Sequence, residues 1–154
     1  RDPAAVADLV VGSCRVKASV VAEDERESGM RAILNFGHTA GHAVETAAGH
    51  GRLRHGECVA LGMLAECRWA ANRMGGPADL FARLDALYER LGLARVAPPL
   101  SLESLTKAAS VDKKRLRGTI HTAVPVALGE VRLCRIGTDE VPYMLSSIPG
   151  LLED

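Results

Sequence analysis

Aromatic side chains are scarce in this chain of 154 residues, which has two Phe, two Tyr and one Trp. Aliphatic residues must therefore build the core, and the segments rich in Ala and Leu favour helices. Net charge is also lacking, because 19 basic residues balance 19 acidic ones. This balance argues against nucleic acid or an anionic membrane surface as a partner. Any small anion must be bound by a local cluster of Lys, Arg and His.

Cysteines are few and long apolar runs are missing. The four cysteines form no CxxC pair, which argues against a thiolate zinc site or a disulfide framework and favours a reducing, cytoplasmic setting. No apolar stretch approaches the roughly 20 residues of a membrane span. The first five residues do not resemble a signal peptide, and they include no initiator Met. We therefore expect a cytoplasmic protein without a membrane partner, and a chain that begins within a longer protein.

Hydrophobic periodicity predicts a mainly α-helical domain. Asp2-Pro3 has the form of an N-cap and a first-turn proline, and opens a helix expected to end in the acidic run 23–27, interpreted as a solvated face. Further helical segments are expected over 30–48, 57–74, 78–91, 101–110 and 138–147.

Two segments rich in β-branched residues, 119–128 and 131–136, flank Gly129-Glu130 and predict a β-hairpin. The expected architecture is a helical, bundle-like domain with one small β-hairpin over residues 1–148, followed by a loose tail over 149–154.

The most informative residues lie between 31 and 45. If this segment is helical, four polar residues share one face, namely Asn35, His38, His42 and Glu45. Such a stripe is costly to bury without a purpose. Gly37 and Gly41 weaken a helix by roughly 1 kcal/mol each relative to Ala, so a ligand or a neighbouring helix is expected to pack against the backbone there.

The histidines have the spacing of metal ligands. His38 and His42 are one helical turn apart, and His55 begins the next helix, where a helix–loop–helix turn would return it to the His38 face. Neutral imidazoles suit a divalent metal such as zinc. A catalytic zinc usually has three protein ligands, and the spacing leaves Glu45 or Glu57 open as the third.

Several cations are candidates for binding a carboxylate or a phosphate. They are Lys17, Arg31, Lys113, Lys114, Arg115 and Arg117. His50 and His121 have no evident partner in the sequence and are expected to be structural or surface residues.

Three blocks in order, GHTxGHAxE from Gly37 to Glu45, HGExVAxGM from His55 to Met63, and Asp112-Lys113-Lys114, resemble the C-terminal domain of 3-dehydroquinate synthases. The likeness covers nearly the whole chain. It implies conversion of 3-deoxy-D-arabino-heptulosonate 7-phosphate into 3-dehydroquinate and phosphate, by a lyase of the shikimate pathway that makes aromatic amino acids. It also implies NAD+, a divalent metal (zinc or cobalt), and a homodimer of the full-length protein.

Carried over by position, the resemblance implies a role for nine residues. His38 and His55 would be metal ligands, and the catalytic residues would be Lys17, Glu27 and His42. The substrate-binding residues would be Lys17, Arg31, Asn35, His42, Lys113 and Lys114. In this scheme Lys17 and Arg31 serve the substrate's carboxylate, whereas Asn35, His42 and one of the two lysines hold its phosphate. Glu27 would orient this group through His42.

The family's third metal ligand, a Glu, and its NAD-binding domain lie upstream of the residues present here, and the chain has no GxGxxG loop. We therefore expect the chain alone neither to bind NAD nor to turn over, and its two-histidine metal site to be weak.

Three other interpretations stay open. One is a secondary-metabolic sugar-phosphate cyclase that makes aminodehydroquinate, deoxy-inosose or valiolone. Another is a relative of iron-dependent alcohol dehydrogenases, which Asn35 and the Asp112–Lys114 turn argue against, since simple alcohols carry no phosphate. The third is a non-catalytic helical module that binds a metal or a partner protein. Lys17 with Arg31 favours a substrate carboxylate, and hence the synthase or the aminated variant.

Overall fold

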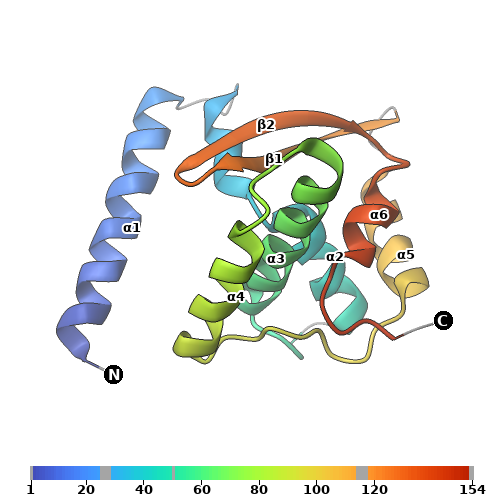
Figure 1. The fold of residues 1–154 in the computed structure, drawn as a ribbon, viewed down its shortest axis with the longest axis horizontal. Helices are drawn as coiled ribbons and strands as arrows, with labels where there is room; N and C mark the ends of the chain where they lie inside the picture. The colour runs from blue at the N-terminus through green and yellow to red at the C-terminus, as the bar shows by residue number, and fades with distance from the viewer. Residues whose placement is uncertain (1, 25–28, 50, 114–117, 153–154) are drawn as a thin grey trace.

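The computed structural model describes residues 2–24, 29–49, 51–113 and 118–152, and of residues 111–113 it describes the backbone. The expected mainly helical domain with one hairpin is confirmed (Figure 1). Its elements are α1 (Pro3–Glu23), the 3-10 helix η1 (Met30–Asn35), α2 (His38–Ala48), α3 (His55–Met74), α4 (Leu80–Leu91), α5 (Leu102–Lys113), β1 (Thr119–Ala127), β2 (Glu130–Gly137) and α6 (Val141–Ser146).

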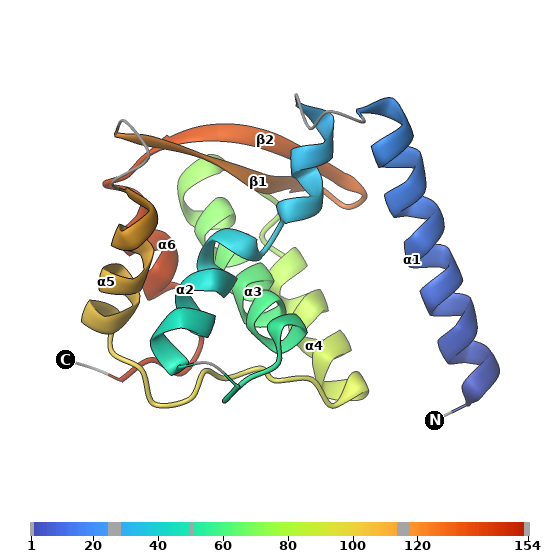
Figure 2. The same ribbon diagram turned by 180° about the vertical axis from the view of Figure 1, so that it is seen from behind.

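Helix α3 is the centre of the fold, with α2, α4, α6 and β1 packed against it. The antiparallel hairpin of β1 and β2 lies across one end of these helices, beside η1 (Figures 1 and 2). Trp69 of α3 is 1% exposed, and aliphatic residues such as Leu61, Leu105 and Leu145 surround it in the core. Aliphatic side chains therefore make up most of this core, as the composition requires.

Helix α1 differs from the other α-helices of the described structure because none of its residues is buried. Asp2 caps its start, accepting a hydrogen bond from the Ala4 N–H at 3.0 Å. The helix stands at one edge of the molecule, next to η1 (Figures 1 and 2). Exposed apolar residues line it, and they include Val6, Leu9, Val10, Val11 and Val16. No helix in the described part of the chain is both long and apolar enough to span a membrane.

The expected continuous helix over residues 30–48 is wrong. The chain forms η1 as far as Asn35, turns at Phe36 and Gly37, and begins α2 at His38. Gly37 has φ of +84°, in the left-handed region that favours glycine. Asn35 therefore lies before the turn, and only His38, His42 and Glu45 share the face of α2.

The first part of the expected loose tail is tied to the segment between α4 and α5. The Ala97 N–H donates to the Pro149 carbonyl at 2.9 Å, and the Leu152 N–H donates to the Leu100 carbonyl at 3.1 Å. Ala97 and Leu100 are both buried. These bonds extend the ordered structure to residue 152.

Three glycines allow the start of α2 to lie directly against α3. A Cβ on Gly41 would be 3.0 Å from the Cys58 carbonyl oxygen, and one on Gly62 would overlap the carbonyl oxygen of Gly37. Gly37 in turn faces the backbone and side chain of Met63. The neighbour that explains Gly37 and Gly41 is therefore helix α3, which settles one question that the sequence leaves open.

We expect Gly62→Ala to destabilise the fold by about 1–3 kcal/mol, because an added methyl group meets fixed backbone and the two helices must separate. Gly12→Ala is the matched control, since Gly12 is also helical but a Cβ there meets no atom within 4 Å. The control should gain up to about 1 kcal/mol from helix propensity. Urea unfolding followed by circular dichroism measures both, and equal stability of Gly62→Ala and wild type would contradict the close crossing.

Candidate metal and substrate site

Three histidines converge where the N-termini of α2 and α3 meet. His38 is the first residue of α2, His42 follows one turn later, and His55 is the first residue of α3. The ring centroids are 5.4 Å apart for His38 and His42, 5.4 Å for His38 and His55, and 5.7 Å for His42 and His55. One nitrogen of each ring lies within 4.8 Å of the other two. The three rings can thus surround a single ion.

Two of the rings already have an oxygen at Nδ1. His38 Nδ1 lies 3.4 Å from the Phe36 carbonyl oxygen, and His55 Nδ1 lies 3.1 Å from Glu45 Oε2. A proton on each Nδ1 would be donated to that oxygen, which leaves Nε2 with a lone pair. Metal-binding histidines commonly have this second hydrogen bond. The residues present therefore fit a divalent metal.

The surroundings of His38 favour its neutral form. Burial lowers the pKa of His38, and the neighbouring His42 and His55 lower it further, against the opposing effect of the Phe36 carbonyl. A metal competes with protons for an imidazole nitrogen. His38 can therefore accept a metal near neutral pH without first losing a proton.

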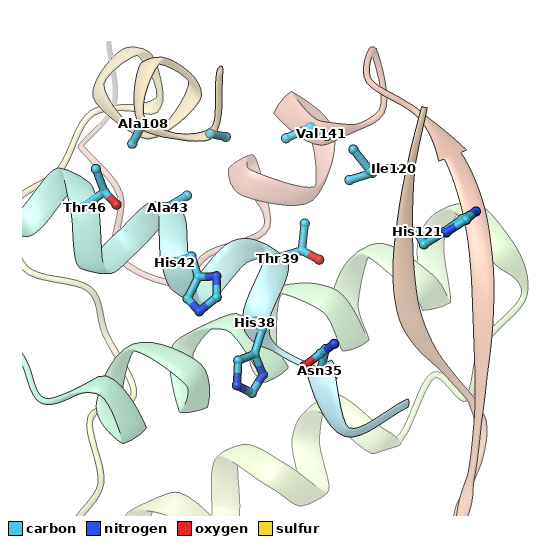
Figure 3. Close-up of a pocket in the computed structure, with 11 residues that line it drawn as sticks. Asn35, His38, Thr39, His42, Ala43, Thr46, Ala108, Ile120, His121 and Val141 are labelled. Carbon is cyan, nitrogen blue, oxygen red and sulfur yellow. The ribbon is translucent and has the colours of Figure 1, made fainter. Parts of the chain in front are cut away.

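A cavity of about 310 Å³ opens beside this cluster (Figure 3). Asn35, His38 and His42 line it on the side of η1 and α2, and the first and third of these are residues that the family resemblance implies for substrate binding. Its other walls are mainly small or apolar and come from α2, α5, β1 and α6, namely Thr39, Ala43, Thr46, Ala108, Ala109, Ile120 and Val141. The cavity thus combines an apolar wall with polar groups at the end that holds His38 and His42.

His121 also lines the cavity, although it was expected to be a structural or surface residue. It lies on β1 and is exposed. The next residue, Thr122, is buried, and its hydroxyl lies 3.1 Å from that of Thr39. This hydroxyl pair joins β1 to α2 behind the histidines.

The other predicted site residues lie outside this cavity or outside the residues that the structure describes. Lys17 is on α1 and lines a separate groove with Leu34 of η1. Arg31 is half-buried in η1, and its backbone N–H donates to Asp24 Oδ2 at 3.0 Å. Among the described residues, Asn35 lines the cavity together with His38 and His42, whereas Lys17 and Arg31 do not line it. Glu27 and Lys114 lie outside the described residues, and Lys113 is described by its backbone alone, at the end of α5.

Asp24 departs from the expectation that the run 23–27 is a solvated face, whereas Glu23 is exposed as expected and residues 25–27 lie outside the described part of the chain. Its side chain is 8% exposed and accepts hydrogen bonds from the backbone N–H groups of Gly29, at 2.8 Å, and Arg31, at 3.0 Å. The carboxylate therefore links the end of α1 to the start of η1. Nothing in the spacing of the acidic run distinguishes this residue from its neighbours.

Glu66 is a second buried acid that the sequence analysis did not single out. It is 1% exposed and accepts hydrogen bonds from the N–H groups of Gly37, at 2.7 Å, and Ala40, at 3.2 Å. It therefore holds the turn that places His38 at the start of α2. One sequence signal could have identified Glu66, namely its position on the same helical face as Gly62 and Trp69. A small and an apolar residue on that face indicate that it is buried.

The comparison with known families matches residues 1–115 to the family described as 3-dehydroquinate synthase C-terminal. The chain belongs to this family. A 3-dehydroquinate synthase from Symbiobacterium thermophilum is 50% identical over 137 residues, covering 84% of this chain and 37% of the relative. One from Geobacter metallireducens is 46% identical over 114 residues, covering 74% of this chain and 32% of the relative. The chain thus spans about a third of the length of these relatives.

Solved structures of sugar-phosphate cyclases share the fold of this family member. The structure of 2-deoxy-scyllo-inosose synthase complexed with carbaglucose-6-phosphate, NAD+ and Co2+ aligns with a TM-score of 0.80 at 21% identity, covering 95% of this chain and 42% of that chain. ValA (2-epi-5-epi-valiolone synthase) from Streptomyces hygroscopicus subsp. jinggangensis, with NAD+ and Zn2+ bound, aligns with a TM-score of 0.75 at 21% identity, covering 96% and 41%. These likenesses confirm the expected dehydroquinate synthase-like fold.

Burial raises the pKa of Glu66 to about 8, despite the backbone N–H groups that favour its ionised form. Between pH about 4.5 and about 8 the folded state retains a proton that the unfolded state has released. The free energy of unfolding should therefore fall as the pH rises through this window, by up to about 1.4 kcal/mol per pH unit from this group. Glu66→Gln should lack this component.

The measurement is urea unfolding of wild type and Glu66→Gln at several pH values between about 6.5 and 8, where the usual carboxylates no longer titrate. Subtracting the pH dependence of the free energy of unfolding of Glu66→Gln from that of wild type removes the contributions of all other titrating groups. Equal pH dependence in both would mean that the Gly37 and Ala40 N–H groups keep Glu66 ionised throughout.

Proposed function

We propose that this chain is the metal- and substrate-binding part of a 3-dehydroquinate synthase, which converts 3-deoxy-D-arabino-heptulosonate 7-phosphate into 3-dehydroquinate and phosphate in the shikimate pathway. One observation carries the proposal. The two family blocks, GHTxGHAxE and HGExVAxGM, are separate in sequence but bring three imidazoles together beside a cavity that Asn35 and His42 line. This is the arrangement needed to hold a metal next to a small polar substrate.

His38 and His55 are the proposed ligands of zinc or cobalt, which when bound would polarise the hydroxyl that is oxidised and the ketone formed from it. NAD+, bound by an N-terminal domain, would accept the hydride in that oxidation. His42 and Asn35, on the cavity side of the cluster, would hydrogen-bond the phosphate end of the substrate. Holding one substrate conformer through elimination, reduction and ring closure is the main contribution of these groups.

Three further roles rest on the family's pattern. Lys17 and Arg31 would bind the substrate carboxylate, and one of Lys113 and Lys114 would neutralise the leaving phosphate. Glu27 would orient His42. Arg31 is the second residue of the 3-10 helix that ends at Asn35, which supports its place near the substrate.

The identity of the substrate depends on the carboxylate-binding pair. Relatives at 46–50% identity are named 3-dehydroquinate synthase, and Lys17 with Arg31 suits a substrate that carries a carboxylate. The alternative is a secondary-metabolic cyclase, since 2-deoxy-scyllo-inosose synthase and ValA share the fold. Sequence identity favours the first interpretation.

The remainder of the functional protein would be an N-terminal NAD-binding domain, with residues 1–148 as the C-terminal domain of a cytoplasmic homodimer. The exposed apolar residues of α1, such as Val6 and Leu9, support further protein packing on that helix. All four cysteines are free thiols, as a reducing compartment would keep them.

Titration with Co2+ tests the metal site. His38→Ala and His55→Ala should each abolish measurable binding, because each removes one of the imidazoles that surround the ion. His121→Ala is the matched control, since His121 lines the same cavity but is not part of the cluster. Calorimetry and cobalt absorbance measure the affinity. Unchanged binding in both cluster variants would refute the proposed ligands.

Activity can be tested by replacing the matching segment of the Symbiobacterium thermophilum relative with this chain. The chimera should release phosphate from 3-deoxy-D-arabino-heptulosonate 7-phosphate with NAD+ and Co2+. His42→Ala should lower kcat by about 100-fold or more if this imidazole assists proton transfer or phosphate departure. A chimera that acts on a hexose 6-phosphate and not on the heptulosonate would instead support the inosose synthase alternative.

A further inference from the structure

Glu45 connects the two helices that carry the proposed metal ligands. It lies on α2, seven residues after His38 and therefore on the same helical face. Its Oε2 lies 3.1 Å from Nδ1 of His55, the first residue of α3. The hydrogen bond thus sets the position of the His55 ring relative to the helix that bears His38.

The geometry does not suit Glu45 as a metal ligand itself. Among the described residues, the donor atoms within 4.8 Å of one another belong to His38, His42 and His55. Glu45 instead meets the Nδ1 side of His55, and the two nitrogens of an imidazole point away from each other. Glu57, the other candidate for a third ligand, uses its Oε2 to accept the Arg54 N–H at 2.8 Å and so caps α3.

We propose that Glu45 is a positioning residue, which accepts the Nδ1 proton of His55 and so turns Nε2 of that ring toward the metal. The proposal deepens the proposed function and rests on it for the presence of the metal. His38 has the same arrangement with a different acceptor, the Phe36 carbonyl. One ligand is therefore oriented by the backbone and the other by a carboxylate that substitution can remove.

The energetic consequence should fall on metal affinity more than on folding. Glu45 and His55 have side-chain exposures of 34% and 53%, and a half-exposed pair of this kind contributes little to stability. A carboxylate at Nδ1 fixes the tautomer and makes Nε2 a stronger donor, and loss of such a group typically weakens metal binding by about 10–100-fold.

The first experiment reads the tautomer without any metal. Two-bond 1H–15N spectra of the metal-free chain, recorded at about pH 8.5 where histidine is ordinarily neutral, distinguish the Nδ1–H form from the Nε2–H form. Wild type should show His55 with the proton on Nδ1. Glu45→Ala should shift His55 toward the Nε2–H form, and an unchanged His55 signal would overturn the proposal.

The second experiment is Co2+ titration of Glu45→Ala, Glu45→Gln and Glu57→Gln. Glu45→Ala should weaken binding by about 10–100-fold, and Glu45→Gln should fall between it and wild type because its amide oxygen still accepts the proton. Glu57→Gln is the matched charge control and should weaken binding far less than Glu45→Ala, since it removes a carboxylate charge at the same helix end but one whose hydrogen bond comes from the Arg54 N–H. Urea unfolding confirms that all three variants are folded.

The cobalt absorption spectrum separates positioning from ligation. If Glu45 only orients His55, the weaker complex of Glu45→Ala keeps the band shape of wild type, because the ligand atoms are the same. A changed band pattern would make Glu45 a ligand and overturn the proposal. Absence of Co2+ binding by wild type would refute the metal part of the proposed function, whereas the tautomer measurement would still decide the role of Glu45.

Discussion

The close crossing of α2 over α3 is the constraint on which the site depends. Gly41 and Gly62 remove the side chains that would separate the two backbones, and Glu66 binds the N–H groups at the start of α2 from beneath. The crossing places the first residues of both helices, His38 and His55, with their ring centroids 5.4 Å apart. The imidazole cluster is therefore a consequence of backbone packing, and changes to the glycines should disturb ligand geometry before they alter ligand chemistry.

Local patterns in the sequence were sufficient for most of the fold. Helical periodicity, caps and glycine stops located the helices, and β-branched residues around Gly129 located the hairpin. The same reasoning placed Asn35, His38 and His42 together on one helical face, and the three line one cavity although Asn35 precedes the turn at Gly37. The features that this reasoning missed depend on contacts between residues far apart in the sequence. The turn at Gly37 exists because Met63 and the rest of α3 lie against it, and the donors to Glu66 are 29 and 26 residues away in sequence.

The acidic residues likewise divide into those whose partners the sequence pattern predicts and those whose partners depend on how the chain folds. Asp24 belongs to a run whose composition predicts solvent exposure, yet the chain folds back so that Gly29 and Arg31 donate to it. Glu57 is three residues from its partner Arg54, a spacing typical of a helix cap. Glu45 shares a helical face with His38, but its contact with His55 requires the crossing of α2 and α3. Tertiary packing thus decides which carboxylate accepts a hydrogen bond from a histidine ring and which accepts one from a backbone N–H.

The position of the histidines also creates an electrostatic requirement. The N-terminus of a helix carries roughly half a positive charge, so a cation held by the first residues of both α2 and α3 is disfavoured by both helices. Glu66 offsets this only in part at neutral pH, because burial raises its pKa to about 8. Glu57 at the start of α3 and Glu45 at the His55 ring are the nearby carboxylates. The proposed metal therefore depends on Glu45 for charge as well as for orientation, and any further acidic ligand would act against the same two dipoles.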